Sequence, residues 1–301
     1  MFLSICCITY NHESYIAQAI EGFLMQQTNF DFEIIIGEDH STDKTADIIK
    51  LYQGKYPNKI RLINSPHNVG MSANFIRTLN ASNAKYIALC DGDDYWTNPH
   101  KLQKQVDFLE QHSDYFLCAH RTKKYFQETQ EYLVEQDELF IENKNRDISI
   151  SNFLNPFILN MNSVVFRNSF NFSKTPKNGF KDIFLFAIIL SKGKGVCLNE
   201  ILSVYRIHSK SIWAMKDKLE LYNANSQTAY FMKRYFKNRY DSISDFTWDT
   251  LRGYLEELYN IKGTKREVIK TFVRLCFCFY NRLTPWQRKQ EKSRFIKYLF
   301  S

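Results

Sequence analysis

The chain has 301 residues, 44% of them hydrophobic and 16% aromatic, which is enough apolar material for one large folded domain or two smaller ones. It contains no run of about 18 apolar residues, and its N-terminal "FLSICCITY" lacks the features of a secretory signal, so the sequence predicts neither a transmembrane helix nor a leader. The seven cysteines lie mostly in apolar runs, as expected for thiols of a reducing cytosol, and the formal net charge is +8.

The first 120 residues alternate between strand and helix patterns. Strands are predicted at residues 2–9, 32–38, 59–64 and 85–90, each as a nearly continuous apolar run. Helices are predicted at 14–26, after Ser41 and at 72–82, and another is predicted to begin at Asn98 and Pro99, which suit the N-cap and the first helical position. This alternation indicates an α/β fold with a Rossmann-like, mostly parallel sheet and helices on both faces.

Past residue 115 the alternation weakens. Strands are expected at 115–120, at 161–167 and, as one or two strands, at 196–208, and a buried helix is expected at 182–190. Residues 122–138 carry no readable pattern. From about Trp213 the pattern is helical to the end, so the sequence predicts three parts at 1–120, 121–213 and 214–301.

Two acidic clusters follow predicted strands. Glu38 and Asp39 follow the second strand, and Asp91, Asp93 and Asp94 fill the "DGDD" after the fourth. Ligands of an open parallel sheet bind beyond the carboxyl ends of its strands, so both clusters are candidate site residues. Closely spaced carboxylates suit a hard cation such as Mg²⁺ or Mn²⁺ that keeps positions for diphosphate oxygens. A plain solvated turn is the alternative; an EF-hand calcium loop would need a closing glutamate that is missing here.

Several segments of the sequence resemble those of a known protein family. The segment "CDGDDYW" resembles the DxD motif of family 2 glycosyltransferases of the GT-A fold, of the bacterial surface-glycan type. Further segments resemble that family in the same order along residues 1–213: "ITYNHESYIAQAIEGFLMQ", "GEDHSTDKTADII", "NVGMSANF", "FKDIFLF" and "YRIHSKSIW". The resemblance implies an inverting, metal-dependent transfer of a sugar from a nucleotide-sugar to a saccharide acceptor. Residues 1–120 would then bind the nucleotide-sugar, 121–213 would supply the acceptor site and catalytic base, and 214–301 would be a helical extension.

The resemblance also implies which residues bind the metal and which acts as the base. Asp93 would be the principal metal ligand, Asp91 would reach the metal or the ribose, and His208 would be a third ligand. Asp182 would take the proton of the acceptor hydroxyl, as an inverting displacement requires. Taken alone, Asp182 would more often be a helix cap and His208 an ordinary buried histidine. Lys181 departs from the family, which often has an acid or a glycine at that position.

The same resemblance implies which residues would contact the nucleotide. Its contacts would be Thr9, Asn11, Asp39, Asn68, Gly70 and Asp91, with Arg206 and Lys210 at the diphosphate. A carboxylate only accepts hydrogen bonds, so Asp39 selects a base that presents an N–H, and UDP is the expected nucleotide, with guanine as an alternative base. Asn68 and Gly70 could instead form an ordinary turn, and Asp43 is expected to cap the helix that follows it.

The positive charge lies at the C-terminal end. Residues 251–301 hold twelve Lys or Arg and four Glu, which accounts for the whole net charge. Apolar residues within 264–300 fall at helical spacing, which fits either a packed helical cap or an in-plane anchor on an anionic membrane, and disfavours nucleic-acid binding. We expect a cytoplasmic enzyme in peripheral contact with the inner face of the membrane, acting on a lipid-linked acceptor. The alternative is a catalytically idle nucleotide-binding scaffold that keeps the fold.

Overall fold

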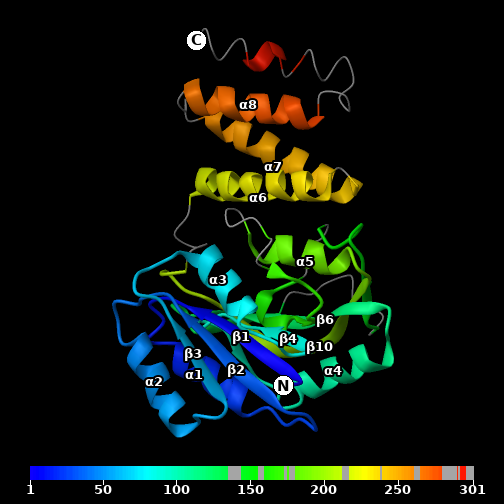
Figure 1. Cartoon of the computed structure of the whole chain (residues 1–301). Helices are drawn as coiled ribbons and strands as arrows, with labels where there is room; N and C mark the ends of the chain where they lie inside the picture. The colour runs from blue at the N-terminus through cyan, green and yellow to red at the C-terminus, as the bar shows by residue number, and fades with distance from the viewer. Residues whose placement is uncertain are drawn as a thin grey trace. The chain divides into compact units, whose positions relative to one another are not determined.

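The computed structural model describes residues 1–134, 144–154, 159–172, 175, 180–211, 217–237, 239–260, 265–279, 290 and 292–295 (Figure 1). The chain divides into two compact units, unit 1 at Met1–Ser209 and unit 2 at Lys210–Ser301. The expected functional boundary at residue 120, inside unit 1, stays a prediction.

Unit 1 is built on one sheet. Within the described residues its strands are β1 (Leu3–Thr9), β2 (Phe32–Glu38), β3 (Ile60–Asn64), β4 (Tyr86–Leu89), β5 (Tyr95–Trp96), β6 (Tyr115–Phe126), β7 (Glu131–Leu133), β8 (Arg146–Ile148), β9 (Val165–Arg167) and β10 (Lys194–Ile207). They lie in the order β3-β2-β1-β4-β9-β6-β10-β5, with β7 beside β6 and β8 beside β10. The neighbours β3, β2, β1 and β4 are parallel, and so are β6 and β10. This confirms the predicted mostly parallel α/β sheet.

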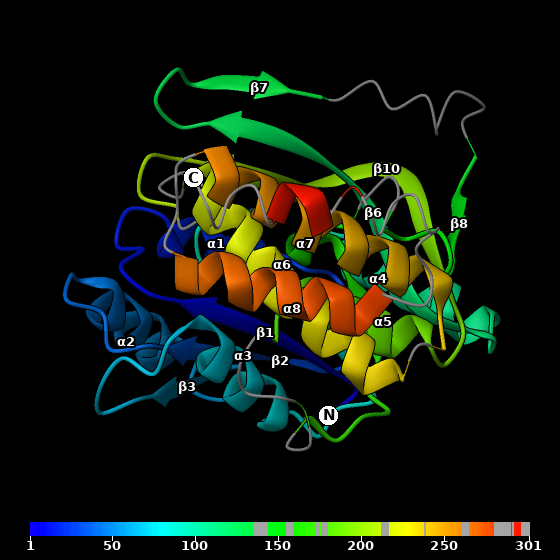
Figure 2. The same ribbon diagram turned by 90° about the horizontal axis from the view of Figure 1, so that it is seen from above.

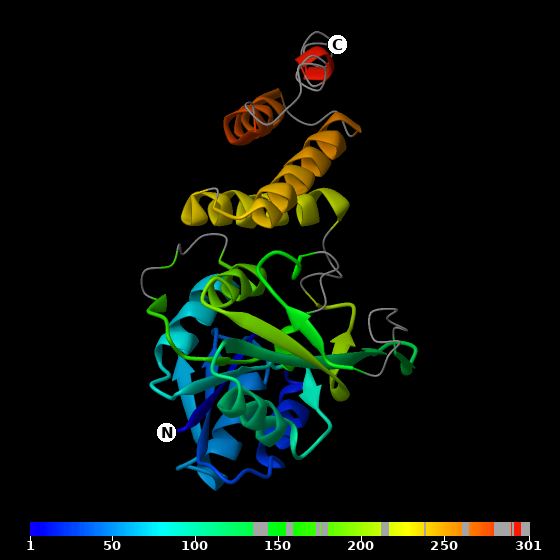
Figure 3. The same ribbon diagram turned by 90° about the vertical axis from the view of Figure 1, so that its right-hand side faces the viewer.

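Helices cover both faces of this sheet, as predicted. They are α1 (Ile16–Leu24), α2 (Thr45–Lys55), α3 (Met71–Asn80), α4 (Lys101–Gln111) and α5 (Asp182–Leu190), with a short 3₁₀ turn at Met161–Ser163. Figures 1 and 3 show α1, α2 and α4 on one face and α3 and α5 on the other.

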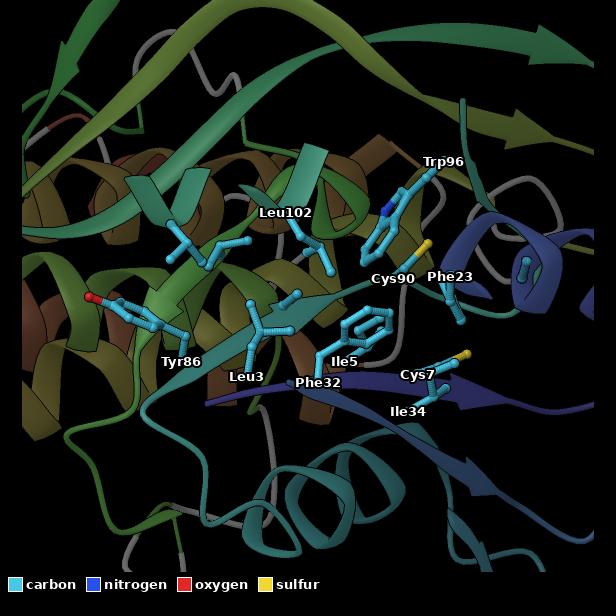
Figure 4. Close-up of a cluster of buried hydrophobic side chains, with 14 of the residues drawn as sticks. Leu3, Ile5, Cys7, Phe23, Phe32, Ile34, Tyr86, Cys90, Trp96 and Leu102 are labelled. Carbon is cyan, nitrogen blue, oxygen red and sulfur yellow. The ribbon is translucent and has the colours of Figure 1, made fainter. Parts of the chain in front are cut away.

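The main core lies between the sheet and the helices α1, α2 and α4 (Figure 4). Alternate residues of β1, namely Leu3, Ile5 and Cys7, point into it beside Phe23 of α1. The residue between two of them, Cys6, is buried too, with its thiol 3.7 Å from a backbone oxygen of α3. Burial on both faces explains why β1 is a continuous apolar run rather than an alternating one.

Three local predictions differ from the structure. The strand expected at 161–167 is a 3₁₀ turn at Met161–Ser163 followed by β9, which begins only at Val165. The helix expected from Asn98 begins at Lys101, because the Asn98 side chain accepts the N–H of His100 and closes a turn before the helix. The unreadable stretch after residue 121 continues β6 to Phe126 and returns as β7. Polar side chains are tolerated there because residues of β6 beyond His120 are only partly buried.

Unit 2 is helical in the part that the structure describes. It contains α6 (Lys218–Phe236), α7 (Asp241–Asn260) and α8 (Lys265–Phe279), with α6 packed on α7 and α7 on α8 (Figure 3). Asp217 caps α6 by accepting the N–H of Glu220 at 2.8 Å. A small core joins Leu255 and Leu258 of α7 to Val268 of α8.

The helical pattern predicted from about Trp213 is thus confirmed for the described residues. Most of residues 280–301, the end of the basic segment, lies outside them. No helix in the described parts of the chain is both long enough and apolar enough to cross a membrane.

Candidate active site

The candidate site residues gather at one edge of the sheet. Thr9 ends β1, while Asp39 and Asp91 follow β2 and β4, and these parallel strands bring their carboxyl ends together. Antiparallel β9 separates β4 from β6, so β6 and its parallel neighbour β10 point the same way as β4. His208, which follows β10, therefore belongs to the same edge. So does Asp182, at the start of the helix that leads back into β10.

Asp93 lies between two histidines. Its Oδ2 is 3.2 Å from Nε2 of His208 and 3.7 Å from Nε2 of His12. Burial acts to raise the pKa of Asp93, but the two imidazoles outweigh it and hold that pKa below its ordinary value. Asp93 therefore stays an ionised carboxylate at neutral pH.

His12 is a site residue that the sequence analysis missed. Its Nδ1 is 3.1 Å from the Thr9 hydroxyl, so both ring nitrogens face polar atoms of the site. Burial lowers the pKa of His12, which favours the neutral imidazole. Its place just beyond the first predicted strand, at the edge where ligands bind, was the signal that could have found it.

Asp91 carries a buried oxygen that lacks a partner. Within the described residues, nothing hydrogen-bonds to its Oδ1. Burial first, and then the charges of Asp93 and Asp182, raise the pKa of Asp91. A buried polar atom of this kind is unfavourable unless a ligand or a cation faces it.

Residues 91–94, here called the acidic loop, are fixed to the neighbouring strands by Gly92 and Asp94. A Cβ added at Gly92 would lie 2.7 Å from Thr9 Oγ1 and 2.8 Å from Thr9 Cβ, so only glycine lets the loop close onto β1. On the other side, Asp94 Oδ1 accepts the backbone N–H of Arg206 at 2.8 Å, which joins the loop to β10.

The structure gives Arg206 different partners from the predicted diphosphate. Its Nε donates to the backbone oxygen of Asp93 at 2.8 Å, and its two terminal nitrogens donate to the side chains of Gln127 and Gln18. Its guanidinium carbon lies 4.9–5.4 Å from three ring centroids, those of Tyr15, Tyr95 and Tyr125. In the described structure Arg206 holds the acidic loop, and its contact with a diphosphate stays a prediction.

Asp182 is partly buried near the acidic loop. Burial raises the pKa of Asp182, and the N–H of Ile183, donated to Oδ1 at 2.7 Å, offsets this in part. The segment before it is fixed by Ser72 of α3, which donates to the backbone oxygen of Phe180. The Tyr205 phenol, also missed from the sequence, has its pKa raised by burial and then by four carboxylates, those of Asp94, Asp93, Asp91 and Asp182. One phenol therefore lies within electrostatic reach of all four acids.

The predicted nucleotide residues Asp39, Asn68 and Gly70 do come together. The two oxygens of Asp39 accept the N–H groups of Val69 and Gly70 at 2.9 Å, and Asn68 Oδ1 accepts the latter as well. Gly70 has φ +85°, a conformation that favours glycine. These contacts tie the loop before α3 to the end of β2, and the expected contact of Asp39 with a base stays a prediction.

Asn11 joins the loops after β1 and β2. Its Oδ1 accepts the N–H of Thr42 at 2.8 Å, and its own N–H donates to the hydroxyl of Ser41 at 2.9 Å. Asp43 accepts the N–H of Thr45, the first residue of α2, at 2.9 Å, although the N-cap position itself is taken by Lys44 and not by Asp43 as expected.

The donor atoms of Asp93, His208 and Asp91 fit a divalent cation. Carboxylate oxygens with one imidazole nitrogen suit Mg²⁺ or Mn²⁺, and the unpartnered oxygen of Asp91 is the kind of atom that a cation satisfies. Across the described residues, no group of three or more His, Cys, Asp or Glu side chains is arranged to hold a metal ion. A bound ion would therefore take further ligands from water or from a substrate.

Known proteins resemble this chain over most of its length. Residues 4–172 match the model of the family described as glycosyl transferase family 2. The uncharacterized protein Rv1520 of Mycobacterium tuberculosis is 37% identical over 212 residues, which is 70% of this chain and 60% of that protein. The glucosyltransferase WfaP of Escherichia coli is 29% identical over 220 residues, 72% of this chain and 81% of that protein.

Solved structures show a likeness of fold at low sequence identity. Staphylococcus aureus TarS 1-349, in complex with UDP, has a TM-score of 0.67 and 15% identity, covering 99% of this chain and 89% of that one. The mannosyltransferase PcManGT from Pyrobaculum calidifontis, in complex with GDP-Man and Mn²⁺, has a TM-score of 0.60 and 12% identity, covering 99% and 86%. The acidic loop at the sheet edge, the family match and these neighbours lead to one conclusion: the chain belongs to glycosyl transferase family 2 and has the GT-A fold.

Proposed function

We propose that this protein is an inverting, metal-dependent glycosyltransferase that moves a sugar from a UDP-sugar onto a lipid-linked saccharide in surface-polysaccharide synthesis. The observation that carries the proposal is Asp93 held between His12 and His208, beside the unpartnered oxygen of Asp91 and the partly buried Asp182. This places candidate ligands for a cation and a candidate base at one edge of the sheet.

The similar proteins support the choice of substrates. The name of WfaP gives UDP-Glc as its donor and a GlcNAc-diphosphoundecaprenol as its acceptor. TarS was solved with UDP and with UDP-GlcNAc, and PcManGT with GDP-Man and Mn²⁺. Since the match spans only 60% of the length of Rv1520, the activity and partners of the whole protein are part of this proposal.

In the proposed reaction, Asp93 and His208, with Asp91, would hold Mg²⁺ or Mn²⁺, which when bound supplies positive charge to the leaving diphosphate. Asp182 would act on the acceptor. As the acceptor oxygen bonds to the anomeric carbon, the bond from that carbon to the diphosphate oxygen breaks and the hydroxyl proton passes to the Asp182 carboxylate. The raised pKa of Asp182 makes it a stronger base than an exposed aspartate.

We also propose that the protein works at the cytoplasmic face of the membrane, in peripheral contact with it. Supporting this, α8 exposes Ile269 and Val273 on the same stripe as the basic Arg266 and Lys270. Aliphatic side chains among cations suit the interface of an anionic bilayer.

Asp93→Asn tests the proposal, because the amide keeps the size of the side chain but removes its charge. We expect release of UDP from UDP-sugars to fall by about a hundredfold or more, and EDTA to abolish it in the unaltered protein. The measurement is nucleotide release from a panel of UDP- and GDP-sugars with Mg²⁺ or Mn²⁺. Asp107→Asn, on the exposed side of α4, is the matched control. Full activity in EDTA would refute metal dependence, and absence of turnover with every donor would favour the idle scaffold.

A further inference from the structure

A row of tyrosines leads from the candidate metal ligands to the surface. The ring of Tyr15 is 4.6 Å from that of His208, and the Arg206 guanidinium connects Tyr15 to Tyr95 and Tyr125. Tyr132 continues the row: its ring is 4.7 Å from that of Tyr125, and its hydroxyl is 3.1 Å from that of Tyr95. These contacts link Tyr15, the N-cap of α1, to residues of β5, β6, β7 and β10.

The row is partly buried at Tyr15 and Tyr125, buried at Arg206 and Tyr95, and exposed at Tyr132. Arg206 is 5% exposed and Tyr95 is 8% exposed, but Tyr132 is 54% exposed. Tyr132 sits on β7 directly opposite Tyr125 on β6, and Figure 2 shows β7 alongside the end of β6 at the border of the sheet. The ammonium of Lys123 lies 4.4 Å from the centroid of the Tyr132 ring. The outer end of the row is thus an exposed aromatic ring with hydroxyl and ammonium groups beside it.

The outer end of the row lies on the opposite side of the acidic loop from the predicted nucleotide residues. Asp39, Asn68 and Gly70 belong to the β2 and α3 side of β4, whereas Tyr125 and Tyr132 belong to β6 and β7 on its other side. A donor bound beside β1 and β2 leaves the β6 side for the second substrate.

We propose that Tyr132, with Tyr125 and Lys123, forms a saccharide subsite for the acceptor, an inference that rests on the proposed glycosyltransferase function. Lys123 lies over the Tyr132 ring and Tyr125 packs against it, so a pyranose would place its C–H face on the part of the ring that stays exposed. The Tyr132 hydroxyl, which already bonds to that of Tyr95, and the Lys123 ammonium can bond to sugar hydroxyls. The fixed contacts of the row, from Tyr132 through Arg206 to the acidic loop, hold this ring in place relative to the candidate site.

Binding at Tyr132 can be measured without turnover. The protein is labelled with 3-fluorotyrosine, and the fluorine resonance of Tyr132 is identified by its loss in Tyr132→Phe. Two probes are titrated in the presence of UDP and Mg²⁺: GlcNAc-α-diphosphate carrying a decyl chain, and decyl diphosphate without the sugar. We expect only the sugar probe to shift the Tyr132 resonance in a saturable manner.

Affinity for the same probes is then compared between variants by calorimetry. Tyr132→Ala should weaken binding of the sugar probe about tenfold, the size expected for loss of one apolar ring face. Tyr132→Phe keeps the ring and should bind within about threefold of the unaltered protein. Tyr56→Ala, which removes an exposed tyrosine at the end of α2, should bind equally.

Three results would overturn the subsite: no shift at Tyr132, an equal shift with decyl diphosphate, or equal affinity in Tyr132→Ala. The second result would mean that the neighbouring exposed Leu133 and Val134 bind the alkyl chain instead. Failure of the proposed function looks different, because nucleotide release would then be absent in every protein while the sugar probe still shifted Tyr132.

Discussion

Asp93 and Asp182 carry the same functional group, but their surroundings shift its pKa in opposite directions. The imidazoles of His12 and His208 hold the pKa of Asp93 below its ordinary value, whereas burial raises the pKa of Asp182. A low pKa suits a carboxylate that faces a cation, and a raised pKa suits one that accepts a proton. Environment therefore assigns the two acids to different proposed tasks.

Asp182→Asn should separate the proposed base from a structural acid. The amide cannot take the acceptor proton, so we expect kcat to fall by about 10²–10⁴-fold while the donor KM stays within about twofold. The measurement is steady-state transfer with donor and acceptor varied separately. If donor affinity falls as far as kcat, the side chain serves the fold and the base lies elsewhere.

Arg206→Lys tests the anchor of the acidic loop. A lysine ammonium cannot reproduce the planar fork that meets the Asp93 carbonyl and two glutamine side chains, nor its stacking on three tyrosine rings. We expect the loop to loosen, so that the Mg²⁺ concentration needed for half-maximal activity rises several-fold. Arg61→Lys, at an exposed ion pair with Glu33, is the control. An unchanged Mg²⁺ requirement would rule out the anchor role.

At the scale of elements, prediction from sequence succeeded where burial was complete. The strands β1, β2 and β4 and the helix α5 are mostly apolar because most of their residues are buried, so composition alone marked them. The outer half of β6 is only partly buried, which leaves no periodic signal. The start of α4 was misplaced because Asn98 uses its side chain in the turn before the helix.

The candidate site was predictable in the same uneven way. Its acids directly follow strands, so their common edge could be inferred from parallel pairing. His12 was missed because its contact with Asp93 depends on the conformation of the loop after β1. The partners of Arg206 were missed because they come from α1, β5 and the turn after β6, which only the folded sheet brings together.

The helix α4 buries a lysine at its first residue. Lys101 donates to Gln105 at 2.7 Å, and its ammonium lies 4.1 Å from the centroid of the Trp96 ring. Burial lowers the pKa of Lys101 from 10.5 to about 7. Between these two values the unfolded chain binds a proton that the folded chain does not, so this residue makes folding more favourable as pH rises through that window.

Lys101→Met should therefore change the pH dependence of stability. We compare the free energy of unfolding of the variant with that of the unaltered protein. The variant's advantage should be greatest below pH 7 and should fall by on the order of 5 kcal/mol towards pH 10.5. Urea unfolding at several pH values measures it, and Lys50→Met, at an exposed lysine of α2, should leave the dependence unchanged. A difference that is flat across the window would show that Lys101 keeps an ordinary pKa.

For the whole molecule, the main question is whether α8 of the basic C-terminal part only packs on α7 or also contacts a membrane. Val268 of α8 packs with Leu255 and Leu258 of α7, so α8 has a buried side within unit 2. Its opposite stripe exposes Ile269 and Val273 among basic residues. A packed helix and a membrane-facing helix are thus compatible, because the two roles use different sides of α8.

The double substitution Ile269→Asn and Val273→Asn tests the membrane contact without touching that buried side. We expect its partitioning onto vesicles containing anionic lipid to fall about tenfold at a fixed salt concentration, since both aliphatic groups lose their contact with the interface. Co-sedimentation with vesicles measures it, with Leu51→Asn on α2 as the exposed control. Equal sedimentation of the double variant and the control would leave α8 as a packed cap only.

The pairing of Asp93 with His208 also has a consequence for biosynthesis. The two residues are 115 positions apart, and His208 follows β10, the last strand that the structure describes. During synthesis on the ribosome, the acidic loop emerges long before Arg206 and His208, which contact it in the folded protein. Until β10 pairs with β6, His208 and Arg206 cannot reach the three aspartates. A nascent chain that stops before residue 194 can pair β1, β2, β3 and β4, yet it lacks the second histidine, so cation binding should arise late and together with closure of the sheet.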